Sequence, residues 1–204
     1  MTTKERIGKG AEVIAFLLAA FSGFLKGFAP PDETGASFAV GVASFAALLI
    51  FLLISALAQR NLDPSRRKYW YLAASLFSVA FLVLAFVYQD ARTAHTFLWP
   101  PNEEPKTLYV AGSTLTPKAQ AAVAKDSSLT AATLVAGFGG IDKDLGVDKR
   151  TSVWTADSIR SVGRTLSIEY VVMVLSLAAA IFCLTEGLLL RTTPPPSPNP
   201  APAA

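Results

Sequence analysis

The sequence predicts an all-α membrane protein with four transmembrane helices and a small, mainly helical extracytoplasmic domain between the third and fourth. Hydrophobic residues make up 52% of the 204 residues, and the mean hydropathy is +0.43. Charged residues make up 16%, below the roughly 25% of an average soluble domain. The apolar residues gather in four blocks near 11–28, 36–58, 69–88 and 168–190. Each block is close to the ~20 residues with which a helix crosses a bilayer core.

The first block, 11–28, is expected to be a signal anchor rather than a cleaved signal peptide. It has no A-x-A-like cleavage site before a soluble chain, and a second span follows after the short link FAPPDETG. Pro30 and Pro31 end the first helix. Because the link is so short, we expect the first two helices to form an antiparallel hairpin.

The basic residues predict the orientation of the four spans. The N-terminal tail, 1–10, is mainly basic, and the tip at 29–35 carries no basic residue. Cytoplasmic loops carry an excess of lysine and arginine. We therefore expect both termini in the cytoplasm and residues 89–167 on the opposite side. An Ala/Leu-rich, cysteine-poor composition favours the bacterial inner (plasma) membrane. The topology-determining residues of the loop between spans two and three are Arg60, Arg66, Arg67 and Lys68.

The connection 89–167 is predicted to hold short helices. Thr116 followed by Pro117 is typical of a helix start, and Ser127 or Ser128 is expected to cap a second helix, LTAATLVAGF. The segment TLYVAGSTL is expected to form a short strand or hairpin. A domain this small, without disulfides, needs apolar contact from outside itself.

The fourth span is expected to begin well outside the membrane. Thr155 can cap a helix that no residue pattern interrupts before Arg191. We expect either a continuous rod or a bend at Gly163, with Ile159, Val162 and Leu166 on its buried face.

Small residues recur every four positions along the first two spans. In lipid, such small residues let helix backbones approach closely and hold helices together. This pattern has two interpretations: packing of the first helix on the second, favoured by their short link, or a self-association face between protomers. The predicted packing residues are Ala11, Ala15, Ala19, Gly23, Gly27, Gly35, Ala39, Ala43 and Ala47.

Glu186 is the ionisable residue that lies furthest inside a span. It is interpreted either as a polar site facing the bundle interior or as an interfacial carboxylate paired with a residue such as Arg60. The single histidine, His95, and single cysteine, Cys183, do not form a typical zinc site or a disulfide. We expect no cofactor, no metal site and no catalytic residues, because no catalytic constellation stands out.

The tail 191–204 is proline-rich and is expected to be disordered in the cytoplasm. It is interpreted as an inert solubilising tail or, alternatively, as a docking peptide. The predicted partners are the lipid bilayer and either a second copy or another membrane subunit. Nucleic acid is not expected, because no basic stripe is interleaved with aromatic residues.

Three classes of function remain open on the sequence. The favoured class is a non-enzymatic, oligomeric structural, sensor or effector component of a membrane complex. The alternative is a small channel or transporter subunit, against which stands the lack of central polar residues and broken helices. A membrane-embedded enzyme is the third class.

The orientation can be tested with reporter fusions. A periplasm-dependent phosphatase fused after Ser127 should be active, and the same enzyme fused after Asp63 should be inactive, because of the charge bias described above. Phosphatase activity on intact cells is the measurement. The reverse pattern would contradict the predicted topology.

Overall fold

The computed structural model describes residues 28–31, 36–60, 67–101, 104–142 and 146–189. These residues are mostly helical. Three of the helices are long and apolar enough to cross a membrane. The first predicted span lies outside the described residues, except for its last residue, Phe28.

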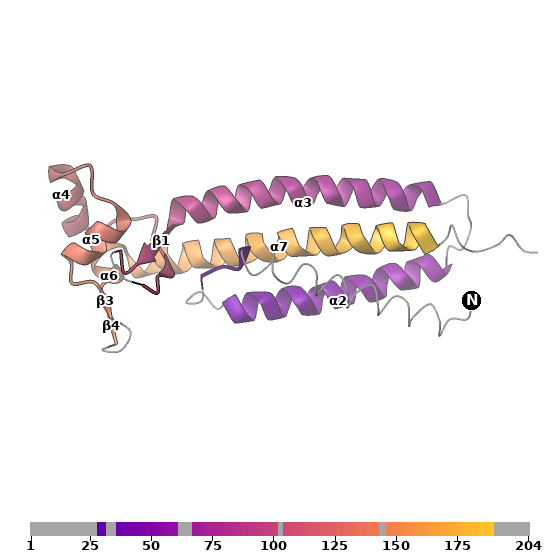
Figure 1. Ribbon diagram of the computed structural model, residues 1–204, viewed down its shortest axis with the longest axis horizontal. Helices are drawn as coiled ribbons and strands as arrows, with labels where there is room; N and C mark the ends of the chain where they lie inside the picture. The colour runs from indigo at the N-terminus through magenta and orange to yellow at the C-terminus, as the bar shows by residue number, and fades with distance from the viewer. Residues whose placement is uncertain (1–27, 32–35, 61–66, 102–103, 143–145, 190–204) are drawn as a thin grey trace, which may run out of the picture.

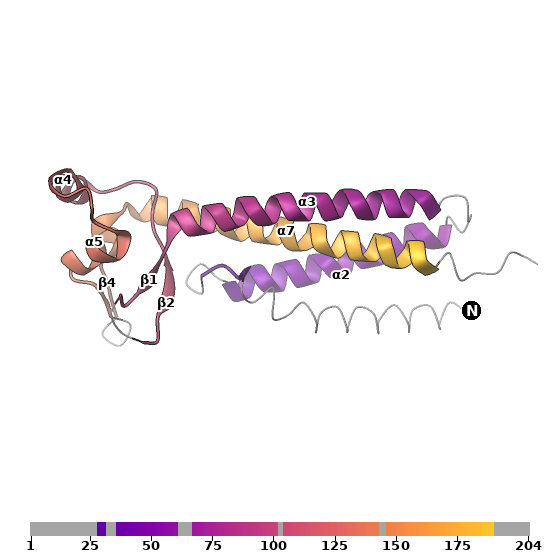
Figure 2. The same cartoon turned by 45° about the horizontal axis from the view of Figure 1, so that its top comes forward.

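The three long helices are α2 (Ala36–Arg60), α3 (Arg67–His95) and α7 (Ala156–Leu189). They run side by side, with α7 between the other two (Figures 1 and 2). Helix α7 packs closely on both α2 and α3, whereas α2 and α3 barely touch each other over their described lengths. The bundle therefore depends on α7, which contributes one side to each helix interface.

Helix α7 is the predicted continuous rod. It contains 34 residues and begins directly after Thr155, whose carbonyl accepts from the backbone N–H groups of Ser158 and Ile159. It continues through Gly163 without interruption. Val162 and Leu166 are buried, as the amphipathic pattern predicts.

Large apolar side chains cover the outer surfaces of α2 and α3. Phe38, Phe45, Leu72, Leu76 and Phe86 are all more than 60% exposed. In water such a surface would be unfavourable. In a bilayer it contacts lipid tails, as expected of membrane-crossing helices.

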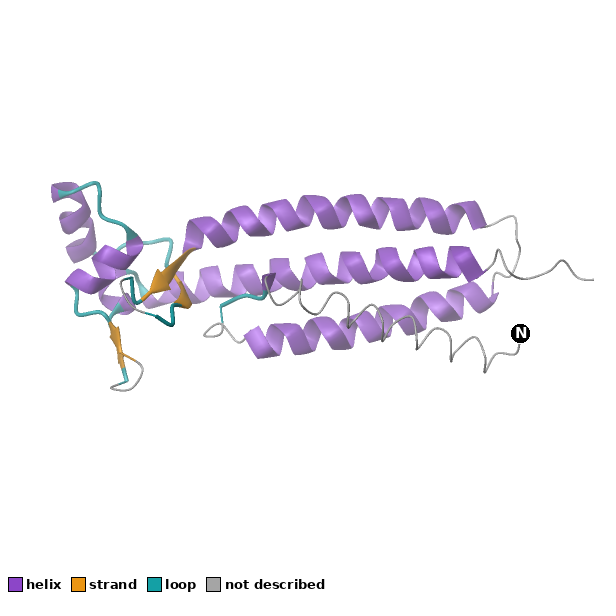
Figure 3. Cartoon of the chain, in the orientation of Figure 1, coloured by secondary structure: helices purple, strands orange, loops and turns teal. Residues whose placement is uncertain are grey.

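The chain between α3 and α7, together with the first turns of α7, forms a small unit that we call the head. Its first element was not predicted: β1 (Thr96–Trp99) follows α3 directly and pairs antiparallel with β2 (Thr107–Val110), with Phe97 opposite Tyr109. Figure 3 shows this hairpin at the junction between the bundle and the short helices.

Two short helices follow in the head. Helix α4 (Pro117–Lys125) has the predicted Thr116 cap, whose side chain accepts from the Ala119 N–H. Helix α5 (Ala131–Gly137) is capped by Thr130, not by Ser127 or Ser128 as expected. Ser128 is engaged elsewhere: its N–H and Oγ both bond to Asp126 Oδ1, at 2.9 and 2.6 Å.

The remaining head elements are β3 (Ile141–Asp142), β4 (Val147–Asp148) and α6 (Arg150–Val153). The turn before β3 uses Gly139 and Gly140 at φ of 107° and 74°, which few other residues adopt without strain. Arg150 forms an ion pair with Asp148 at 2.6 Å and lies over the Tyr109 ring. Hydrogen bonds from Arg150 hold the pKa of Asp148 below its usual range.

The head has its own apolar core, centred on Phe97, Tyr109, Val135 and Trp154. Ile159 of α7 packs against this core and also against a second core in the bundle. The two cores are therefore joined through α7.

Among the described glycines of the head, Gly112 is the most closely packed. A Cβ atom there would lie 2.5 Å from Trp154 Cβ and would also overlap Ser158 Oγ. We expect Gly112→Ala to destabilise the head by about 1–3 kcal/mol, the usual range for overpacking. Urea unfolding in detergent, followed by tryptophan fluorescence, measures the change. Gly137→Ala is the matched control, because nothing lies within 4 Å of its Cβ position. Equal stability of the two variants would contradict the packing described.

Candidate functional site

The junction between bundle and head is lined by two tyrosines. Tyr88 of α3 and Tyr170 of α7 are almost fully buried, and their ring centroids lie 6.0 Å apart. Tyr88 Oη donates to the carbonyl oxygen of Phe28 at 2.7 Å. This bond ties the end of the first apolar segment to α3.

Glu169 lies beside this tyrosine pair on α7. Its Oε2 is buried and has no hydrogen-bond partner among the described residues. His95, at the end of α3, is close enough to act on it electrostatically. A carboxylate oxygen buried in this way is the least satisfied polar atom of the junction.

Glu186 lies at the opposite end of the bundle, which we call the far end. It faces α2, where Ser55 Oγ donates to Glu186 Oε1 at 3.5 Å. This distance is at the long limit for a hydrogen bond. The structure therefore places Glu186 at a helix interface near the end of α7. Its functional role remains a prediction.

A close contact between α3 and α7 also lies at the far end. Tyr71 Oη donates to the Gly187 carbonyl at 3.2 Å and accepts from Arg67 Nε at 3.3 Å. The Arg67 guanidinium also lies over the Tyr71 ring, and the electrons of the ring face attract this cation. The small residues Ala179, Cys183 and Gly187 along the fourth span indicate close packing, but their spacing did not predict Tyr71 as the partner of Gly187.

Two of the other topology-determining residues, Arg60 and Lys68, lie at the same end. Lys68 lies over the Tyr69 ring, Arg60 is the last residue of α2, and Arg66 lies outside the described residues. The side of the membrane on which this end lies remains a prediction.

The predicted packing residues are described in part. Ala39 and Ala43 are 3% and 2% exposed and belong to the core that contains Tyr170 and Met173 of α7. Ala47 is half-buried. The other six lie outside the described residues: Ala11, Ala15, Ala19, Gly23, Gly27 and Gly35. The second-span residues thus contribute to the core around α7, and the role of the whole set stays a prediction.

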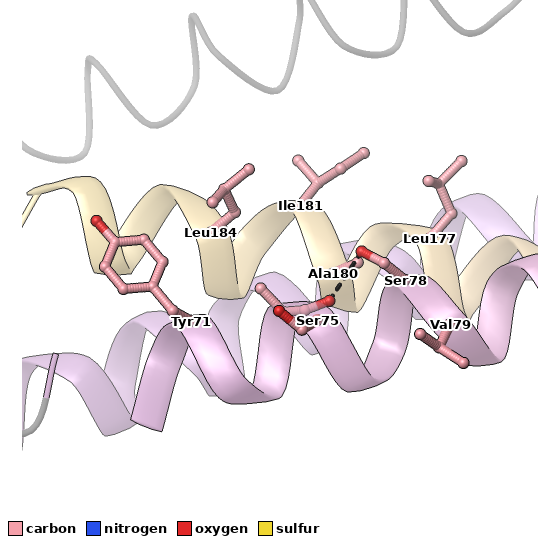
Figure 4. A pocket seen from close by; sticks show the side chains of 9 residues that line it. Tyr71, Ser75, Ser78, Val79, Leu177, Ala180, Ile181 and Leu184 are labelled. Atoms are coloured by element: carbon pink, nitrogen blue, oxygen red, sulfur yellow. Dashed lines mark hydrogen bonds between the residues drawn. The ribbon is translucent and has the colours of Figure 1, made fainter. Parts of the chain in front are cut away.

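A groove runs along the bundle between α3 and α7. Figure 4 shows Tyr71, Ser75 and Ser78 along the α3 side and Leu177, Ile181 and Leu184 along the α7 side. Its lining also includes the small residues Ala74 and Ala180. Ser78 Oγ donates to its own helix, to the Ala74 carbonyl at 2.8 Å, so it offers little free polarity to an occupant.

The described residues hold no group of three or more His, Cys, Asp or Glu side chains that could bind a metal ion. The sequence DKDLGVD places Asp142 in β3 and Asp148 in β4, and Asp148 is engaged by Arg150. Comparison with known protein families, curated proteins and solved structures finds no match.

These features describe a site of helix–helix and bundle–head packing. The polar contacts tie helices to one another, and the apolar cores join the bundle to the head. The arrangement can hold α7 in a fixed position relative to α2, α3 and the head.

The contact at Gly187 provides a test of the far end. A Cβ there would lie 3.1 Å from Tyr71 Cε1, so Gly187→Leu should push α3 and α7 apart. We expect a loss of about 1–3 kcal/mol in stability, as for other overpacked sites. Thermal unfolding in detergent measures it. Gly41→Leu on α2 is the control, because no atom lies within 4 Å of its Cβ position. An unchanged midpoint for Gly187→Leu would show that the contact is dispensable.

Proposed function

We propose that this chain is a multi-pass membrane protein that couples its head to its membrane bundle, as a sensor or effector component of a membrane complex. It acts without catalysis of its own. The observation that carries the proposal is α7, a single helix that enters the head core at one end and the bundle core at the other.

The contacts along α7 support coupling. Near its start, Ser158 is buried against Thr114 and Thr155 in the head. In its middle, Leu166 and Met173 are 1% and 0% exposed within the bundle core. Near its end, Phe182 packs on Phe51 of α2, with ring centroids 5.1 Å apart. A packed core has discrete arrangements rather than a continuous range, so a binding event at the head can shift α7 as a unit.

The same proposal includes an orientation and an assembly state. The basic residues at the far end support a cytoplasmic location for that end, with the head outside the bacterial inner membrane. The head is small and leans on α7 for part of its core, which supports assembly into a complex, either with further copies or with another membrane subunit.

If the bundle and the head are coupled, a substitution that destabilises the bundle should also lower the unfolding temperature of the head. Phe182→Ala removes a buried ring far from the head, and a loss of about 3–5 kcal/mol lowers an unfolding midpoint by roughly 6–20 °C. In a Trp70→Phe background, the remaining tryptophans, Trp99 and Trp154, both report on the head. We expect their thermal transition to move down with that of the bundle.

Leu188→Ala is the control, because Leu188 is on the same helix but 48% exposed. It should leave the head transition unchanged. If Phe182→Ala also leaves the head transition unchanged while the bundle is destabilised, the head folds independently. The coupling role would then be wrong, and a freely hanging binding domain would be the better account.

A further inference from the structure

The groove between α3 and α7 is open in the described part of the bundle, and its shape points to one occupant. We propose that it holds the first apolar segment of this same chain, residues 11–27, packed as a helix parallel to α3 and antiparallel to α7. This assignment differs from both interpretations of the small-residue pattern, which placed that segment on the second span or on another copy. It does not depend on the coupling role.

The first argument is the anchor at Phe28. This residue directly follows the segment, and its carbonyl oxygen accepts from Tyr88 Oη at 2.7 Å. Its side chain packs against the core that contains Tyr170 and Val174. The segment therefore ends at a fixed point on the α3–α7 pair.

The second argument is continuity between the anchor and the groove. On α7, Tyr170, Val174, Leu177, Ile181 and Leu184 are spaced by three or four residues, so they share one face of the helix. Tyr170 and Val174 lie at the anchor, and the other three line the groove.

The same spacing holds on α3. Tyr88, Phe81 and Ala74 are seven residues apart, which places them on one face. Phe81 packs against the core at the anchor, and Ala74 lines the groove. The groove is therefore the extension of the surface on which Phe28 already sits.

The third argument is length. As a helix, residues 11–27 extend about 26 Å at 1.5 Å per residue. Tyr71 precedes Tyr88 by the same number of residues as 11 precedes 28, so the helical distance between Tyr71 and Tyr88 is also about 26 Å. A helix that runs parallel to α3 and ends at the anchor thus begins level with Tyr71, where the groove ends.

The fourth argument is the complementarity of small residues. The floor of the groove includes Ala74, Ser75, Ser78 and Ala180. The segment carries Ala11, Ala15, Ala19, Gly23 and Gly27 along one side. Small residues on both surfaces allow the close backbone approach that stabilises helix pairs in lipid.

Thiol crosslinking in native membranes tests the assignment. By this parallel alignment, Ala15 lies level with Ser75. In a Cys183→Ala background, Ala15→Cys is combined with Ser75→Cys, and a protease site is inserted between Asp63 and Pro64. After oxidation and proteolysis in detergent, a disulfide between positions 15 and 75 keeps the two fragments joined on a non-reducing gel.

We expect the joined product to exceed that of the control pair, Ala15→Cys with Leu76→Cys, by about ten-fold. Leu76 neighbours Ser75 but is 68% exposed and does not line the groove. A disulfide forms only between Cα atoms less than about 7 Å apart, so the neighbouring position discriminates. Ile54→Cys with the native Cys183 is the positive control, since both residues belong to one buried cluster and lie on opposite sides of the cut.

The outcomes separate the occupants. A joined product supports the proposal when the protein runs at the mass of one chain before proteolysis. A band of twice the mass before proteolysis, formed through positions 15 and 75, would show that the groove takes the segment of a second copy. No joined product, with a working positive control, would show that the segment packs elsewhere. Either of these last two results overturns the assignment.

Discussion

The position of α7 between α2 and α3 is the constraint on which the rest of the structure depends. Over the described residues, α2 and α3 barely touch each other, so each is held by its own contact with α7. Lipid provides no hydrophobic driving force between helices, and packing must supply the stability. The close approaches that supply it are Ala39 and Ala43 on one side of the bundle and Tyr71 with Gly187 on the other. The head depends on the same helix, because Ile159 is shared between its core and that of the bundle.

The burial pattern follows from this arrangement. α2 and α3 turn large apolar side chains such as Phe38 and Phe86 outward, whereas α7 keeps Tyr170 and Met173 inside. In a soluble protein the outward residues would be anomalous. On helices long and apolar enough to cross a membrane, such surfaces suit contact with lipid. Polar contacts join the helices at the two ends of the bundle, Tyr88 to Phe28 and Tyr71 to Gly187.

Sequence reasoning predicted the elements whose signals are local. Apolar length predicts the three long helices, and the Thr116-Pro117 pair predicts the start of α4. It missed β1, because Thr96–Trp99 follows a helical pattern without a breaker and becomes a strand only by pairing with residues 107–110. It chose the wrong cap for α5, because Ser128 and Thr130 are equally good acceptors until Asp126 engages Ser128. At the candidate site, the sequence predicts a polar role for Glu186, whose hydrogen bond to Ser55 is long. The closer approach of two helices lies one residue later, at Gly187. Interhelical contacts of this kind join residues more than a hundred positions apart, and no local pattern specifies them.

The central position of α7 also affects the order in which the fold can assemble during synthesis. The ribosome makes α2 and α3 first and α7 last, at about 5–20 residues per second. Until the residues after Thr155 have been made, α2 and α3 lack the helix on which both pack, and the head lacks Ser158 and Ile159. Among the described residues, both cores can therefore be completed only once α7 has been made. The final span acts as the closing step of assembly, and a chain that stops short of it has neither a finished bundle nor a finished head.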